Sequence, residues 1–276
     1  MKKNEKYYKN PNIVLGISMI MVIFILMVIG LFYTPCDWEL IDVSNKLQSP
    51  SWQHILGTDD LGRDILSRLM IGARTSFFIG ITVSLLGMLI GVIIGSISGY
   101  FGGAVDEIIM KLIDTQMAFP GILIALMMVA VFGGSTKNII IALAIMSVPK
   151  FARITRSGYI KYKNYEFVKA EKARGAGNLR IMYIHILPNL KSELIVTFSM
   201  SFASAVMSEA GLSYLGLGGN PKIPSFGKML SDAQGAIYEY PGYVIAVTLA
   251  VTFLVMGFNM TADGIREIKK DKDSKI

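Results

Sequence analysis

The sequence predicts an all-α, polytopic integral membrane protein with six transmembrane helices. Of its 276 residues, 53% are hydrophobic and 17% are charged, and the mean hydropathy is +0.52, which excludes one or two soluble domains. Several uncharged stretches are long enough to cross about 30 Å of hydrocarbon, which takes roughly 20 residues. The distribution of 27 Lys and Arg residues then indicates the topology.

Four long apolar stretches and two shorter ones are expected to form the six spans. The long stretches cover residues 10–36, 75–105, 115–136 and 240–262. The shorter stretches, 138–149 and 194–208, cross only if their helices continue into flanking charged residues whose side chains reach the membrane surface. The first stretch is longer than the apolar core of a signal peptide and lacks a small-x-small cleavage site, so a retained helix is favoured.

The positions of the cations favour six spans over four. With six spans and an inward N-terminus, 20 of the 27 Lys and Arg residues lie inside, whereas four spans leave only 10 there. The inside set combines Lys111, ten cations at 150–191, five in the C-terminal tail, and the N-terminal lysines Lys2, Lys3, Lys6 and Lys9. We therefore expect both termini in the cytoplasm.

A glycine stripe runs along the predicted second span. Gly87, Gly91, Gly95 and Gly99 recur every four residues, and Gly80 and Ser84 extend the same face. A helix face without side chains lets another backbone approach closely. Packing within the bundle is the favoured interpretation, with a subunit interface or a backbone-lined pathway as alternatives.

Two residues interrupt the apolar character around the third span. Asp114 has Lys111 three residues earlier on the same helix face, so we expect these two side chains to form a structural ion pair. Pro120 deletes a backbone hydrogen bond, so it should kink the span or mark a break in it.

The predicted fifth span has a hydroxyl-bearing face. In hydrocarbon such a face must turn toward other helices or toward a water-filled cavity. Helix-to-helix hydrogen bonding is the favoured interpretation. The alternative is a solute path, whose candidate residues are Thr197, Ser201, Ser204, Ser208 and Glu209.

The basic loop between the fourth and fifth spans has the features of a short folded helix. Asn164 is expected as the N-cap, and Glu166 places negative charge in the first turn. The sequence GAG at 175–177 supplies a stop, a second short helix should follow from Leu179, and Pro188 should open the fifth span. A short helix held between two membrane helices suits a groove on a soluble partner better than a membrane surface, which would require a larger apolar face.

This loop resembles the EAA loop of bacterial ABC importer permeases. The resemblance rests on KAE at 169–171, Gly175, and HILPN at 185–189. Lys169 stands where the family pattern has a leading Glu, so the contact of that acid is expected to pass to Glu166 or Glu171. The resemblance implies a cytoplasmic coupling helix, whose implied ATPase-coupling residues are Glu166, Phe167, Ala170, Glu171, Ala173, Arg174, Gly175, Ala176 and Gly177.

Each part of the implied coupling helix has an expected role. Phe167 would be the apolar anchor, and Ala170 and Ala173 the close-contact surface. Glu171 and Arg174 would be charges at the rim of that surface. Gly175 and Gly177 would form the turn that follows.

Further motifs in matching order narrow the resemblance to the C-type permeases of dipeptide, oligopeptide and nickel importers. They are LGTDDLGRD at 56–64 followed by SR at 67–68, GYFGG at 99–103, EAGLSYLGLG at 209–218, and FN at 258–259 with Asp263, Gly264 and Arg266. The resemblance covers nearly the whole chain after about residue 50. It implies the type I ABC importer permease (MetI-like) fold in a bacterial inner or plasma membrane.

The resemblance also implies an organisation and a set of partners. A helix and an extracytoplasmic segment would occupy residues 1–75, a five-helix permease domain 76–264 with its coupling loop at about 150–191, and a basic cytoplasmic tail 265–276. The implied partners are a second homologous permease, two ATPase subunits that bind ATP and Mg²⁺, and an extracellular solute-binding protein. Lipid surrounds the chain, and no nucleic acid is expected.

A polar, glycine-containing segment at residues 52–74 follows the first span on the outer side. Its acidic and basic side chains alternate, so they can pair with one another into a rigid cap, which is the favoured interpretation. Contact with a docked solute-binding protein is the alternative. The candidate residues for that contact are Asp59, Asp60, Arg63, Asp64 and Arg68.

Several chemistries lack their motifs in this sequence. There is no Gly-x-x-x-x-Gly-Lys-Ser/Thr loop, so the chain is not the ATPase of such a machine. Neither a nucleophile elbow nor a His-Glu-x-x-His pattern supports an enzyme. His54 and His185 lie on opposite sides of the proposed membrane, and Cys36 is the single cysteine, so we expect no metal site, no intrachain disulfide and no cofactor in this chain.

The expected function is a pore-forming permease subunit for short peptides or for nickel and metal chelates. ATP-driven movement of the coupling helix would switch the bundle between inward-open and outward-open states. A stand-alone channel or secondary transporter, which would require a coupling-ion site or an inverted repeat, and a membrane scaffold are the alternatives. The 17 methionines give no evidence for a metal cargo, because methionine is common in apolar helices.

Overall fold

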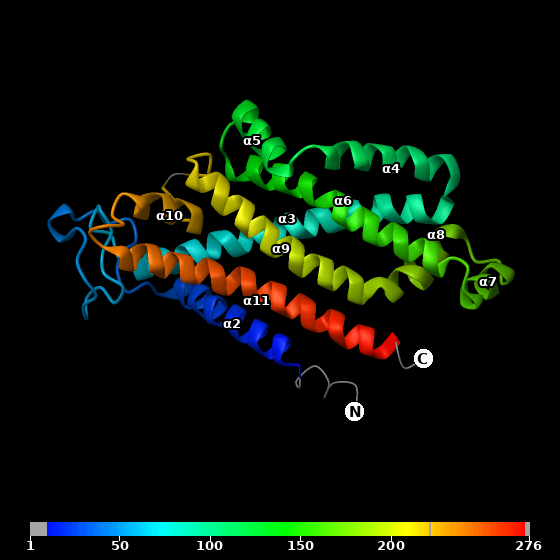
Figure 1. Cartoon of the computed structure of the whole chain (residues 1–276), viewed down its shortest axis with the longest axis horizontal. Helices are drawn as coiled ribbons and strands as arrows, with labels where there is room; N and C mark the ends of the chain where they lie inside the picture. The colour runs from blue at the N-terminus through cyan, green and yellow to red at the C-terminus, as the bar shows by residue number, and fades with distance from the viewer. Residues whose placement is uncertain (1–9, 221, 274–276) are drawn as a thin grey trace.

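The computed structural model is a bundle of long helices with an irregular cap at one end and a short projecting helix at the other (Figure 1). It describes residues 10–220 and 222–273, and within that part the chain forms helices and no strand. The predicted inside cations Lys2, Lys3, Lys6, Lys9 and Lys275 lie outside the described residues. The all-α prediction is confirmed.

Five helical segments of the described chain are long and apolar enough to cross a membrane. They are α2 (Pro11–Phe32), α3 (Ile65–Phe101), α6 (Thr136–Tyr162), the run Asn178–Tyr214 that ends in α9 (Lys191–Tyr214), and α11 (Pro241–Asp273). The helices α4 (Gly103–Ala118) and α5 (Gly121–Phe132) meet at an angle of 82° and pass the same test only as a pair, so the described chain has six spans if this bent pair is counted as one. Pro120 caps α5 at this bend, as its missing N–H predicts.

The helices of the two short predicted spans continue into the flanking charged residues, which they must do to cross a membrane. Helix α6 continues past Lys150 and Arg153 to Tyr162, and the helical run that contains α9 begins well before residue 194. Three predicted boundaries differ from the structure. Helix α3 begins at Ile65, because Asp64 caps it, so the expected division at residue 75 falls inside a helix. Pro188 lies in a 3₁₀ turn ahead of α9. Helix α11 extends into the predicted tail as far as Asp273.

The glycine stripe packs α3 against α6. A Cβ on Gly91 would lie 2.8 Å from the carbonyl oxygen of Val148, and one on Gly99 would lie 2.7 Å from that of Arg156. These distances are too short for any side chain, so the backbones themselves are in contact. Packing within the bundle, the favoured interpretation of the stripe, is confirmed.

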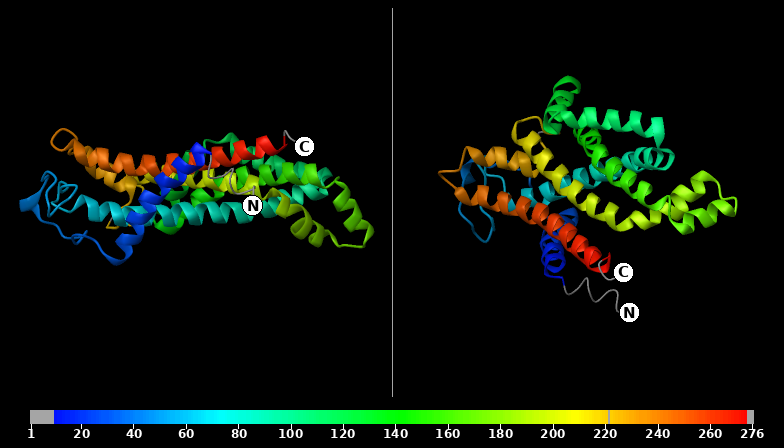
Figure 2. Two further views of the ribbon diagram at one scale, coloured as in Figure 1. Left: turned by 90° about the horizontal axis from the view of Figure 1, so that it is seen from below. Right: turned by 45° about the vertical axis from the view of Figure 1, so that its right-hand side comes forward.

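The remaining helices pack around this pair. Gly80 of α3 faces the Phe202 ring of α9, which in turn stacks on Phe258 of α11 with ring centroids 3.9 Å apart. Helix α2 packs along α11, where the Asn10 amide donates to Glu267 at 2.8 Å. The start of α2 and the last turns of α11 therefore lie together, in the half of the molecule that carries the projecting helix (Figures 1 and 2).

Asp114 forms an ion pair, but its predicted partner is wrong. The Arg153 guanidinium of α6 lies 2.6 Å from the Asp114 carboxylate, whereas Lys111 pairs with Glu107 at 2.7 Å. Lys111 and Glu107 are four residues apart, and Glu ahead of Lys at that spacing is a favourable pair on a helix. Asp114 is thus left to join α4 to α6.

Replacing Gly91 by alanine should weaken the bundle. Because the added methyl group meets the α6 backbone, we expect the Gly91→Ala variant to lose about 1–3 kcal/mol of unfolding free energy. The measurement is the thermal unfolding midpoint of the purified chain in detergent. The matched control is Gly211→Ala in α9, where an added Cβ meets no atom within 4 Å. Equal midpoints for the two variants would contradict the packing described here.

Candidate functional site

The projecting helix is α7 (Glu166–Ala173), which follows α6 at the end of the molecule farthest from the cap (Figure 1). The predicted N-cap, Asn164, is wrong by one residue. Tyr165 occupies the cap position without a side-chain hydrogen bond, because its N–H closes a turn onto the Tyr162 carbonyl at 3.0 Å. Glu166 lies in the first turn as predicted and pairs with Lys169 at 2.8 Å.

One face of α7 is fixed to the bundle. Val168 is fully buried against the chain that returns from α7, which forms the short helix α8 (Asn178–Arg180) and a π-helical turn, η2 (Ile181–Ile186). In the same cluster, the Tyr159 hydroxyl of α6 donates to the Met182 carbonyl at 2.8 Å. The side chains of Val168 and Tyr159 are both fully buried, so α7 cannot shift without disturbing the end of α6.

The opposite face of α7 is exposed and small. Phe167, Ala170 and Ala173 all lie on the surface, and the Phe167 ring packs edge-on against Tyr165 with centroids 6.0 Å apart. Glu171 lies between Arg174 and His185 at the base of this face. Its carboxylate lies 3.0 Å from Arg174 and 3.7 Å from His185.

The turn after α7 depends on one glycine. Gly175 has φ +80°, a left-handed conformation that glycine adopts without strain. Gly177 has φ −67°, which any residue can adopt, and Ala176 between them is half-buried. The predicted coupling residues are thus adjacent in space, but only Gly175 requires glycine for its conformation.

The cap at the other end is built on a buried ion network. Asp59 is fully buried and is paired with Arg63 at 2.8 Å and with Arg68. Asp232 of α10 (Phe226–Gln234) accepts from Arg68 at 3.0 Å and also pairs with Lys228 at 2.7 Å. Self-pairing is as predicted. Asp232 was not identified from the sequence, because no local pattern links residues so far apart.

The ion network buries some of the residues that are candidates for contact with a docked solute-binding protein. Asp59, Asp64 and Arg68 are at most 3% exposed, so their side chains are not available. The Asp60 side chain is 49% exposed and that of Arg63 is 18% exposed. Partial burial, together with the charges of Asp59 and Asp232, raises the pKa of the Asp60 carboxyl above its usual value.

The hydroxyl-bearing face of α9 divides between different cavities. Ser201, Ser204 and Ser208 line a hollow of about 290 Å³ together with Lys150. Glu209 instead lines a separate cavity of about 760 Å³ near the cap, where it accepts a 2.6 Å hydrogen bond from Ser213.

Thr197 lines a third hollow, of about 540 Å³, together with Ser204 and Lys150. Its hydroxyl donates to the Glu193 carbonyl of its own helix at 2.7 Å. Four of the five candidate path residues therefore line two hollows that share Ser204 and Lys150, and Glu209 lies apart from them.

Comparison with known proteins decides the family. Residues 91–268 match the family described as the binding-protein-dependent transport system inner membrane component. The chain is also 38% identical over 259 residues to the dipeptide transport system permease protein DppC of Alkalihalophilus pseudofirmus, with 94% of this chain and 85% of that protein covered.

The chain belongs to this family of inner membrane permeases. It is 38% identical to the glutathione transport system permease protein GsiD of Pectobacterium atrosepticum, over 89% of this chain and 83% of that one. The inward-facing MetNI methionine ABC transporter shares the fold, with a TM-score of 0.58, 17% identity, and 72% and 94% of the two chains covered. This permease is therefore a non-enzymatic membrane subunit of an ABC importer with the MetI-like fold.

Replacing Asp59 in this permease should destabilise the cap. The Asp59→Asn variant leaves the buried Arg68 guanidinium and the partly buried Arg63 guanidinium short of a negative charge, so we expect a loss of about 3–5 kcal/mol in unfolding free energy. Limited proteolysis of residues 33–64 in the purified chain measures the effect. Asp60→Asn is the matched control, since the Asp60 side chain is half exposed and its change should stay within about 0.5 kcal/mol. Equal protection in both variants would contradict the network.

Proposed function

We propose that this permease pairs with a second, homologous permease to form a translocation path for short peptides, driven by two separate ATPase subunits acting on α7. The observation that carries the proposal is the combination at α7 of an exposed Phe167–Ala170–Ala173 face with a fully buried Val168. A rigid helix with one free apolar face suits a groove on a soluble partner.

Two features favour α7 as the part that receives force. Phe167 offers an aromatic anchor, and the alanines beside it allow a partner backbone to come close. On the buried side, Val168 and Tyr159 share one cluster with η2, so displacement of α7 would be passed to α6. ATP and Mg²⁺ would bind to the ATPase subunits, not to this chain.

Short peptides are the proposed cargo. The relatives that cover most of this chain are named for dipeptide and glutathione transport, and glutathione is itself a small peptide. A path for such polar cargo needs hydrogen-bonding side chains in the membrane interior. Ser201, Ser204 and Ser208, beside Lys150, supply them along one wall of α9.

An extracellular solute-binding protein would deliver the peptide to the cap. Asp60 and Arg63 retain exposed surface there, and Trp52 is fully exposed nearby. The ion network beneath holds these residues on a firm base. Uptake of a labelled dipeptide by cells that express the complete transporter tests the cargo. Uptake of nickel alone would contradict it.

Replacing Phe167 should weaken ATPase binding. The Phe167→Ala variant loses the central anchor, so we expect the affinity for the ATPase subunits to fall by about 2 kcal/mol, or roughly thirtyfold. Copurification of the ATPase from detergent-solubilised membranes measures it. Phe132→Ala is the control, because that ring is also exposed but ends α5 at the outer side. Unchanged ATPase recovery with Phe167→Ala would contradict the proposed contact.

Replacing Gly175 should uncouple transport. Valine at φ +80° is strained by about 1–2 kcal/mol or more, so the turn must reshape and α7 must tilt. We expect Gly175→Val to insert normally into membranes and to abolish peptide uptake. Gly177→Val is the control, because φ −67° suits valine and an added Cβ there meets no atom within 4 Å. Normal uptake with Gly175→Val would count against the proposal.

A further inference from the structure

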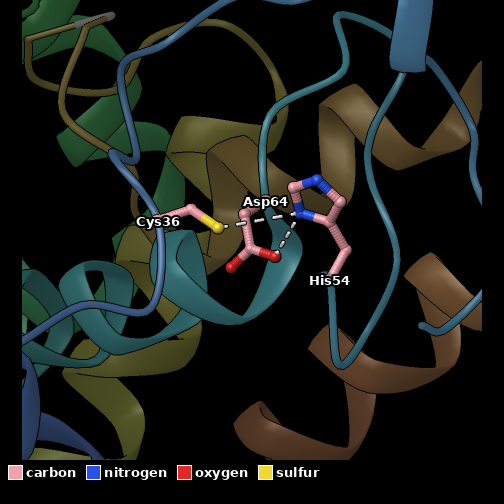
Figure 3. Close-up of side chains that lie close together, drawn as sticks. All are labelled: Cys36, His54 and Asp64. Atoms are coloured by element: carbon pink, nitrogen blue, oxygen red, sulfur yellow. Dashed lines mark hydrogen bonds and ion pairs between the residues drawn. The ribbon is translucent and has the colours of Figure 1, made fainter. Parts of the chain in front are cut away.

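Three side chains with metal-binding atoms converge within the cap (Figure 3). Cys36 follows α2, His54 lies in the loop ahead of the ion network, and Asp64 caps α3. His54 Nδ1 lies 3.0 Å from Asp64 Oδ1 and 3.8 Å from Cys36 Sγ. All three ligand atoms lie within 4.8 Å of one another.

The backbone holds this group in place. Asp64 Oδ2 accepts from the Ser67 N–H at 2.7 Å, which fixes the carboxylate at the start of α3. The Cys36 N–H donates to the Ser67 hydroxyl at 3.0 Å, so the segment after α2 is tied to the same turn. The His54 N–H donates to the Ser51 hydroxyl at 3.0 Å. The side chains are thus positioned before any ion binds.

The charges around the group favour a cation. Asp64 is 2% exposed, and among the described residues its ion pair is with His54, a side chain that is neutral unless protonated. The nearby guanidinium groups of Arg63 and Arg68 are engaged by Asp59 and Asp232. A buried carboxylate without a permanent cation is costly, and a bound divalent ion would remove that cost.

The thiol of Cys36 is free to act as a ligand. Cys36 is the single cysteine of the chain, so disulfide formation within the chain does not compete for it.

We propose that Cys36 Sγ, His54 Nδ1 and Asp64 Oδ1 bind one Zn²⁺ ion. Thiolate, imidazole and carboxylate are the three ligand types that Zn²⁺ accepts, at about 2.3, 2.0 and 2.1 Å. A tetrahedron with these bond lengths separates its ligand atoms by roughly 3.3–3.6 Å. The observed 3.0 and 3.8 Å lie just outside that range, and all three atoms lie within 4.8 Å of one another, so small side-chain rotations would complete the site.

The fourth position is open to water. A hollow of about 530 Å³ borders Cys36 and His54 and is rimmed by Tyr33 and Trp52. Binding releases the thiol proton to solvent, and the neutral imidazole carries its remaining proton on Nε2. The ion would join the end of α2, the outer loop and the start of α3. It would be a resident ion of the cap and not cargo, and in this the proposal departs from the expectation from sequence that the chain has no metal site.

The test measures protection of the single thiol by Zn²⁺. The full-length chain is purified without a polyhistidine tag, and the rate of Cys36 alkylation by a maleimide is measured with and without Zn²⁺. Only the metal-free thiol reacts, so at about ten times the dissociation constant the rate should fall roughly tenfold. Unchanged alkylation in the wild-type chain would overturn the proposal.

Two variants keep the thiol and remove a ligand. His54→Gln and Asp64→Asn should each weaken Zn²⁺ binding by about tenfold or more, so the same Zn²⁺ concentration should leave alkylation nearly unprotected. Asparagine also caps helices, so Asp64→Asn preserves the start of α3. His185→Gln is the control, because it removes the only other histidine, at the α7 end, and should leave protection complete.

A second readout separates metal binding from loss of structure. Zn²⁺ should raise the thermal unfolding midpoint of the wild-type chain and of His185→Gln, but not that of His54→Gln or Asp64→Asn. Without Zn²⁺, the four midpoints show whether each variant folds. Equal Zn²⁺ protection and equal midpoint shifts in all four proteins would show that these side chains do not form the site.

Discussion

The close contact between α3 and α6 is the constraint on which the rest of this permease depends. Glycines at four-residue intervals leave no side chain between the two backbones, so the helices cannot slide or separate without opening a void in the bundle. Helix α3 begins in the cap directly after Asp64, and near the other end of the molecule Tyr159, in the last turn of α6, packs in one cluster with Val168 of α7. One rigid pair therefore joins the two functional ends of the molecule.

The two ends that this helix pair joins are stabilised by different interactions. At the α7 end, apolar burial of Val168 leaves the opposite face free for a partner. At the cap, buried charges take the place of an apolar core, and Asp59 and Asp232 bind the same two arginines. Breaking such a network is costly because it strands a buried charge, so the cap is suited to hold its shape while the helices below it change position.

Much of the fold could be predicted from sequence because its signals are local. Uncharged stretches marked the spans, a four-residue repeat marked the α3–α6 contact, Pro120 marked the break between α4 and α5, and Gly175 marked the end of α7. Each signal acts within one or two helical turns. Boundaries were less predictable, since α3 starts at a capping Asp64 that the apolar pattern does not include.

The side-chain partners could not be predicted where they join distant segments. Arg153 reaches Asp114 from another helix, and Asp232 reaches the cap from α10, although nothing in the local sequence of either pair indicates contact. The same holds for His54. The only other histidine in the sequence, His185, lies at the far end of the molecule, whereas the fold brings His54 to Cys36 and Asp64.

The central claim is that α7 moves as one body with α6 when the ATPase subunits close. Its most direct test is the distance between spin labels at Lys172 of α7, which is outside the proposed contact face, and Ser157 of α6, both exposed, in a Cys36→Ala chain within the full transporter. We predict the same distance distribution in the nucleotide-free and ATP-bound complexes. A shift larger than the width of that distribution would show that α7 moves independently, and would contradict the account.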